Sequence, residues 1–109
     1  MYKTNEEQLN ISLDEFINEW YNKEDYILAD IREEGDKDSK VKMAFEISMY
    51  DIPNSIAMAP TYITVIICSD EETKSEQVAK FMRNSEFNNV FYMESDINTL
   101  LERIPELKR

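Results

Sequence analysis

One stretch of the sequence joins an apolar strand, the only cysteine and the start of a helix: Tyr62-Ile-Thr-Val-Ile-Ile-Cys68-Ser-Asp-Glu-Glu-Thr-Lys74-Ser-Glu-Gln-Val-Ala79. The residues before Cys68 are β-branched and apolar on both faces, which is typical of a central strand in a parallel sheet. Thr73 and Glu76 have the T-x-x-E spacing of a capping box, so a helix is expected to start there. The cysteine is therefore predicted in a short loop between the strand and the helix.

Cys68 is the candidate functional residue of this loop. The N–H groups at a helix start and the positive end of the helix dipole favour an anion, such as a thiolate, a persulfide or a bound oxyanion. We therefore expect a solvent-accessible thiol whose sulfur faces at least two backbone N–H groups of residues 69–75. The alternative is a buried and inert cysteine that ends a strand.

Length and charge limit the class of protein. A chain of 109 residues with 42% hydrophobic content is expected to form a single globular domain, residues 1–109. The formal net charge is -11, from 23 acidic and 12 basic residues. Such a surface repels phosphates, so no nucleic acid and no anionic membrane is expected as a partner, whereas a basic protein is a suitable one.

The expected compartment is the cytoplasm. A single cysteine cannot form an internal disulfide, and the first residues, Met1-Tyr-Lys-Thr-Asn-Glu-Glu, lack the apolar run of a signal peptide. No apolar stretch is long enough to span a bilayer.

The rest of the chain alternates between helix and strand patterns. The patterns predict a helix from the Ser12–Glu15 capping box to about residue 21, a strand over 26–31, a polar break over 35–39, a helix over 41–49, a turn-rich stretch over 52–60, a helix to about 84, a strand over 89–93, and a helix over 97–104 capped by Ser95 or Asp96. This order predicts an α/β fold: a mainly parallel central sheet flanked by helices on both faces. Function collects at the carboxyl ends of the strands in such sheets, where the strand ends at Asp30 and Cys68 would meet.

The order of these elements resembles that of the rhodanese-like domain, the family of sulfurtransferases and dual-specificity cell-cycle phosphatases. The likeness runs from Ile11 to about Leu107. Ile27-Leu-Ala-Asp30-Ile-Arg32-Glu33 is similar to the family's strand ending in Asp-Val-Arg-Glu, and Glu46-Ile-Ser-Met-Tyr-Asp51-Ile52-Pro53-Asn54-Ser55 resembles its Glu-Tyr-x-x-Gly-His-Ile-Pro-Gly-Ala segment after an insertion of about ten residues following Glu33. Ile66-Ile-Cys68 takes the place of the strand that leads to the catalytic cysteine, and Phe87-Asn-Asn-Val90-Phe-Tyr-Met93 is similar to the stretch before the Gly-Gly pair.

The resemblance implies a site built around Cys68 as the residue that carries sulfur, with no cofactor and no metal. The residues implied as binding or supporting groups are Asp30, Arg32, Ser69, Asp70, Glu71, Glu72, Thr73, Lys74 and Ser75. The loop departs from the family's Cys-Arg-x-Gly-x-Arg-Ser pattern, because it is one residue longer, lacks glycine and carries three carboxylates. Lys74 replaces the arginine but lacks its bidentate fork. Tyr50-Asp51 replaces the Gly-His pair, and Ser95-Asp96 replaces the Gly-Gly pair.

Two functions follow from this comparison. The first is a sulfurtransferase or persulfide carrier that uses Cys68 with a small sulfur donor or a sulfur-accepting protein; its activity towards thiosulfate should be weak, because three carboxylates would raise the pKa of the thiol and repel the dianion. The second is a catalytically degenerate interaction module that docks a basic partner through its acidic edge.

Two of the candidate site residues have structural alternatives. Arg32 could form a structural ion pair with Asp30 or Glu33, and Lys74 could be an ordinary solvated residue in the first turn of the helix. Phosphatase activity and a metal site on Asp70, Glu71 and Glu72 have less support, because the loop has no arginine and the chain has no histidine.

Overall fold

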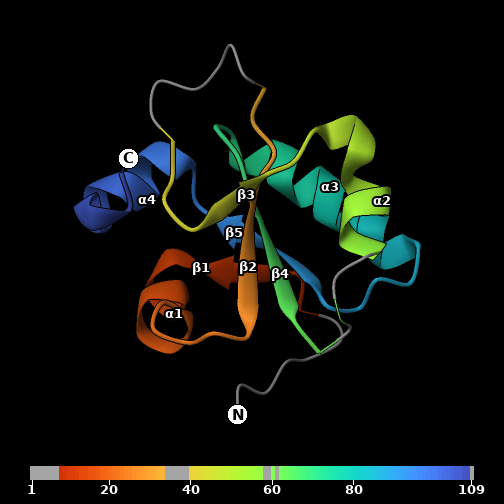
Figure 1. Ribbon diagram of the computed structural model, residues 1–109, viewed down its shortest axis with the longest axis horizontal. Helices are drawn as coiled ribbons and strands as arrows, with labels where there is room; N and C mark the ends of the chain where they lie inside the picture. The colour runs from red at the N-terminus through yellow and green to blue at the C-terminus, as the bar shows by residue number, and fades with distance from the viewer. Residues whose placement is uncertain (1–7, 34–39, 58–59, 61, 109) are drawn as a thin grey trace.

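The computed structural model describes residues 8–33, 40–57, 60 and 62–108. Its centre is a five-stranded sheet with the order β1-β5-β4-β2-β3, in which every neighbouring pair is parallel (Figure 1). The strands are β1 Asn10–Ser12, β2 Tyr26–Asp30, β3 Ala44–Glu46, β4 Thr64–Cys68 and β5 Val90–Glu94. The three longest strands lie in the middle and the two short ones form the edges.

Helices cover both faces of the sheet, which confirms the predicted α/β fold (Figure 1). One face carries α1 Leu13–Glu15, which continues as the π-helical segment η1 Phe16–Trp20, and α4 Ile97–Arg103. The other face carries α2 Ile52–Ala57 and α3 Glu72–Asn84. Two 3-10 turns, η3 Met49–Asp51 and η4 Pro105–Leu107, complete the elements.

The two faces have separate apolar cores, which we call the α1/α4 core and the α2/α3 core. The α1/α4 core contains Phe16, Trp20, Leu28, Ile66, Cys68 and Leu100, among others, and the α2/α3 core contains Ala29, Val65, Ile67, Ala79 and Met82, among others. Alternate residues of a strand point to opposite faces, so β4 sends Ile66 and Cys68 into one core and Val65 and Ile67 into the other. This explains why β4 is apolar on both faces.

Side-chain caps fix two of the predicted helix starts. Ser12 Oγ accepts a hydrogen bond from Glu15 N (3.0 Å), and Asp96 Oδ1 accepts one from Thr99 N (2.7 Å). The prediction for α3 was wrong, because the helix starts at Glu72 and its N-cap is Glu71, which makes no capping hydrogen bond through its side chain. Thr73 is already inside the first helical turn and therefore cannot act as an N-cap.

Two other predictions need correction. The helix predicted over 41–49 is instead strand β3 followed by η3, because pairing with β2 holds this segment in an extended form. The turn-rich stretch contains α2, since Pro53 lies in the first turn, where its missing N–H costs nothing. Strand β1 was not predicted, and the predicted polar break over 35–39 lies outside the described residues.

Among the described residues, no helix has both the length and the apolar character needed to cross a membrane.

Candidate active site at the end of β4

Cys68 is the last residue of β4 and lies in register with Asp30, the last residue of β2. This confirms that the two strand ends meet at one edge of the sheet. Ile31 N also donates a hydrogen bond to Cys68 O (3.1 Å), so the backbone pairing continues past the end of β2. The strand, rather than a loop, therefore holds the cysteine.

The thiol of Cys68 is sealed inside the α1/α4 core. Cys68 is 0% exposed, and its Sγ donates a hydrogen bond to Ala29 O at 3.6 Å. The prediction of a solvent-accessible thiol was wrong, because the pleat of β4 turns Cys68 to the same face as Ile66. A sulfur that donates a hydrogen bond to a carbonyl is a protonated thiol rather than an anion.

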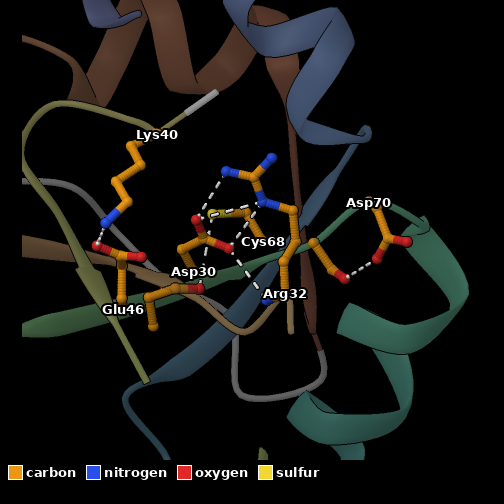
Figure 2. A network of polar contacts seen from close by, with 8 residues as sticks. Asp30, Arg32, Lys40, Glu46, Cys68 and Asp70 are labelled. Atoms are coloured by element: carbon orange, nitrogen blue, oxygen red, sulfur yellow. Dashed lines mark hydrogen bonds and ion pairs between the residues drawn. The ribbon is translucent and has the colours of Figure 1, made fainter. Parts of the chain in front are cut away.

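A buried ion pair lies beside this thiol (Figure 2). Arg32 Nη2 is 2.9 Å from Asp30 Oδ2, Arg32 Nε is 3.1 Å from Asp30 Oδ1, and the backbone N–H of Arg32 donates to the same Oδ1 at 3.0 Å. Asp30 is 1% exposed and Arg32 is 6% exposed. The structural ion pair considered for Arg32 is therefore present.

The electrostatics of this cluster keep the thiol neutral. Burial raises the pKa of Cys68 far above its ordinary value, the negative charge of Asp30 raises it further, and Arg32 opposes both effects only in part. The predicted increase in the pKa of Cys68 is confirmed, but the predicted cause was wrong. Burial and the charge of Asp30 raise the pKa, and the carboxylates of the following loop do not contribute to the shift.

The loop after Cys68 forms its own small network. Ser69 Oγ donates to Asp70 Oδ1 (2.7 Å), and Lys74 Nζ lies 3.4 Å from the same oxygen. Although burial acts in the opposite direction, the hydrogen bond from Ser69 and the charge of Lys74 hold the pKa of Asp70 below its usual value. The cation that could have faced the thiol is thus engaged by a carboxylate of the loop.

The remaining predicted site residues separate into two groups. Glu71, Glu72 and Thr73 are exposed to solvent. Ser75 is 0% exposed, on the face of α3 that also buries Ala79, and its hydroxyl makes no hydrogen bond among the described residues. The structure therefore brings together Asp30, Arg32 and Cys68, and separately Ser69, Asp70 and Lys74.

Two contacts that close the site were not predicted from the sequence. Ile97 N, in the first turn of α4, donates to Ser69 O (2.9 Å) and ties that helix to the loop. The carbonyl of Ala29 is the acceptor for the thiol. Both depend on how distant segments pack, and a pattern of residue types carries no signal for them.

The described part of the chain brings together no group of three or more His, Cys, Asp or Glu side chains that could hold a metal ion. Asp70 is instead satisfied by Ser69 and Lys74.

Comparison with known proteins identifies the fold. No protein-family model and no curated protein matches the sequence. Among solved structures, a rhodanese-related protein from Thermoplasma volcanium matches with a TM-score of 0.70 and 14% identity, over 87% of this chain and 92% of that chain. A single-domain sulfurtransferase from Saccharomyces cerevisiae matches with a TM-score of 0.70 and 15% identity, over 99% of this chain and 100% of that chain. A rhodanese-like domain protein from Staphylococcus aureus matches with a TM-score of 0.62 and 17% identity, over 82% and 85%. The chain has the rhodanese-like fold, as the sequence predicted.

Proposed function

We propose that this chain is an interaction module with a rhodanese-like fold, which docks a basic protein surface through the acidic carboxyl edge of its sheet. The observation that carries this proposal is the sealed thiol. Cys68 is 0% exposed and hydrogen-bonded to Ala29 O. Sulfur transfer needs a thiolate that a donor can reach, and this arrangement supplies neither access nor charge.

The acidic edge supports the docking role. It is formed by the residues that end or follow the parallel strands, and its exposed carboxylates are Glu33, Glu46, Glu71, Glu72 and Glu94. Within the part of the chain that the structure describes, Lys40 and Lys74 each form an ion pair with an acid of this edge, Lys40 with Glu46 and Lys74 with Asp70. An edge with an excess of negative charge attracts a positively charged partner and raises the rate of association. The proposed partner is a basic protein in the cytoplasm.

Sulfur transfer through Cys68 is the second candidate function. The observation that favours it is the place of Cys68 at the end of β4, beside Arg32, in a fold that a single-domain sulfurtransferase from yeast also has. The loop residues 69–71 would have to move away from α4 before a small sulfur donor or a sulfur-accepting protein could reach the thiol. Such a movement would break the hydrogen bond that Ile97 N donates to Ser69 O.

Intact-mass measurement separates the two candidates. After incubation with thiosulfate or a low-molecular-weight persulfide, the docking proposal expects an unchanged mass. A gain of one sulfur mass that reductant removes, and that is absent in Cys68→Ser, would overturn the sealed-thiol argument in favour of the carrier.

A basic probe tests the docking edge directly. A fluorescent peptide of alternating lysine and serine should bind the protein at low salt and dissociate as salt rises. The double variant Glu71→Ser, Glu72→Ser should weaken binding about 2- to 10-fold. The matched control is Glu24→Ser, Asp25→Ser, which removes the same charge from exposed residues just before β2, at the amino end of the sheet. Equal losses in both variants would refute a local docking site.

A further inference from the structure

Two aromatic side chains are exposed where the acidic edge meets the edge strand β3. Phe45, in the middle of β3, is 59% exposed, and Tyr50, in the η3 turn that follows, is 91% exposed. Ala44 packs against the α1/α4 core, so Phe45 projects from the opposite face of the strand. Single exposed apolar side chains are ordinary, but these two stand within six residues of chain and each is followed by an acid, Glu46 and Asp51.

The η3 turn holds one of these aromatic-acid pairs in place. Ser48 caps the turn by accepting a hydrogen bond from Tyr50 N (3.3 Å). The Asp51 carboxylate accepts hydrogen bonds from Ser55 Oγ (3.3 Å) and Asn54 Nδ2 (3.5 Å), both in α2. A carboxylate has about four acceptor positions, so Asp51 keeps capacity for a further donor. The turn thus carries an exposed ring at one residue and an oriented carboxylate at the next.

We infer that this turn gives the acidic edge a preference for arginine over lysine in the partner segment, with Tyr50 and Phe45 as stacking surfaces and Asp51 as the anion. The inference rests on the proposed docking function and names the chemistry of its partner. A guanidinium is planar, stacks on aromatic faces and donates two parallel hydrogen bonds to a carboxylate. A lysine ammonium is a compact, strongly hydrated charge that cannot stack on an aromatic ring as a planar guanidinium does. Carboxylates alone would attract both cations, whereas rings beside carboxylates distinguish between them.

The test compares two fluorescent peptides of equal length and charge, one with arginine and one with lysine, each alternating with serine. Fluorescence anisotropy with the whole protein at low salt should show the arginine peptide binding about 2- to 5-fold more tightly, the range expected for exposed cation–π contacts. Tyr50→Ala, and more strongly the double variant Tyr50→Ala, Phe45→Ala, should bring the two affinities together. The matched control is Phe81→Ala, which removes an aromatic ring that is also exposed (58%) but lies in α3.

The outcomes separate this inference from the function on which it rests. Equal binding of both peptides by the unmodified protein would refute the arginine preference and leave the docking function intact. Loss of the preference in Phe81→Ala to the same extent as in Tyr50→Ala would also refute it, because the effect would not be local. Binding of neither peptide would overturn the docking function together with the inference.

Discussion

The sealed thiol should make the stability of this protein depend on pH in a way that one substitution removes. The pKa of Cys68 is raised far above its ordinary value by burial and by Asp30, whereas the unfolded chain has an ordinary thiol with a pKa of about 8.5. Above that pH the unfolded state has lost its proton and the folded state has kept it, so the free energy of unfolding falls as pH rises. The contribution is fully present below about pH 8 and is lost at about 1.4 kcal/mol per pH unit above the unfolded pKa.

The expected loss between about pH 7 and pH 10 is about 2 kcal/mol, since about 1.5 units of this range lie above the unfolded pKa. Urea denaturation in the presence of reductant measures it, with the fluorescence of Trp20, the only tryptophan and 1% exposed, as the signal. Lysines and tyrosines also titrate in this range, so the informative quantity is the difference between the wild type and Cys68→Ala. The cavity in that variant costs stability at every pH and does not change the slope. Parallel pH profiles for the two proteins would refute the sealed thiol, because the cysteine would then ionise equally in both states.

Four further predictions concern the ion pair, a helix end, a cap and catalysis. Arg32→Met should lower the free energy of unfolding by about 3–5 kcal/mol, because it leaves the Asp30 carboxylate buried without its partner. The control is Arg103→Met, which breaks an ion pair of similar length to Asp14 at an exposed site and should cost at most about 1 kcal/mol. Similar losses in the two variants, measured by urea denaturation, would contradict the argument. Glu86 has φ 72°, so Glu86→Gly should raise the thermal midpoint through a gain of about 0.5–1 kcal/mol, and a lower midpoint would show that the Glu side chain outweighs the backbone. Asp96→Ala should cost about 1 kcal/mol in urea denaturation by removing the α4 cap, and an unchanged midpoint would mean that the cap is dispensable. Thiosulfate:cyanide sulfurtransferase activity should be weak or undetectable, and turnover like that of an ordinary rhodanese would restore Cys68 as a nucleophile.

The fold could be predicted from the sequence because its strongest signals are local. The apolar run before Cys68, the Ser12 cap and the Asp96 cap each depend on neighbouring residues, and the structure confirms all three. Strands β1 and β3 could not be predicted in the same way. Each has three residues, too few to show an alternating pattern, and each is extended because it pairs with a longer strand.

The position of the candidate site could be predicted from the sequence, but the burial and the ionisation of its thiol could not. The strand pattern placed Cys68 and Asp30 at one edge of the sheet, which the register confirms. Whether the sulfur faces a loop or a core depends on the pleat: a shift of one residue would have turned it to the other face. The Asp30–Arg32 pair also shows why the source of the pKa shift was misjudged, because the carboxylate that raises the pKa of Cys68 belongs to another strand and not to the loop that follows the cysteine.

The place of β1 in the sheet has a consequence for how this chain is made in the cell. The first strand of the sequence pairs only with the last, and Asn10 is hydrogen-bonded to Glu94, 84 residues further along the chain. During synthesis on the ribosome, β1 stays unpaired until translation has passed Glu94 and β5 has left the exit tunnel. Before that point β4 also lacks one of its two partners, so an apolar strand edge stays open to other nascent chains. We therefore expect a slow-folding, non-local topology whose most vulnerable period is the interval before the last strand emerges.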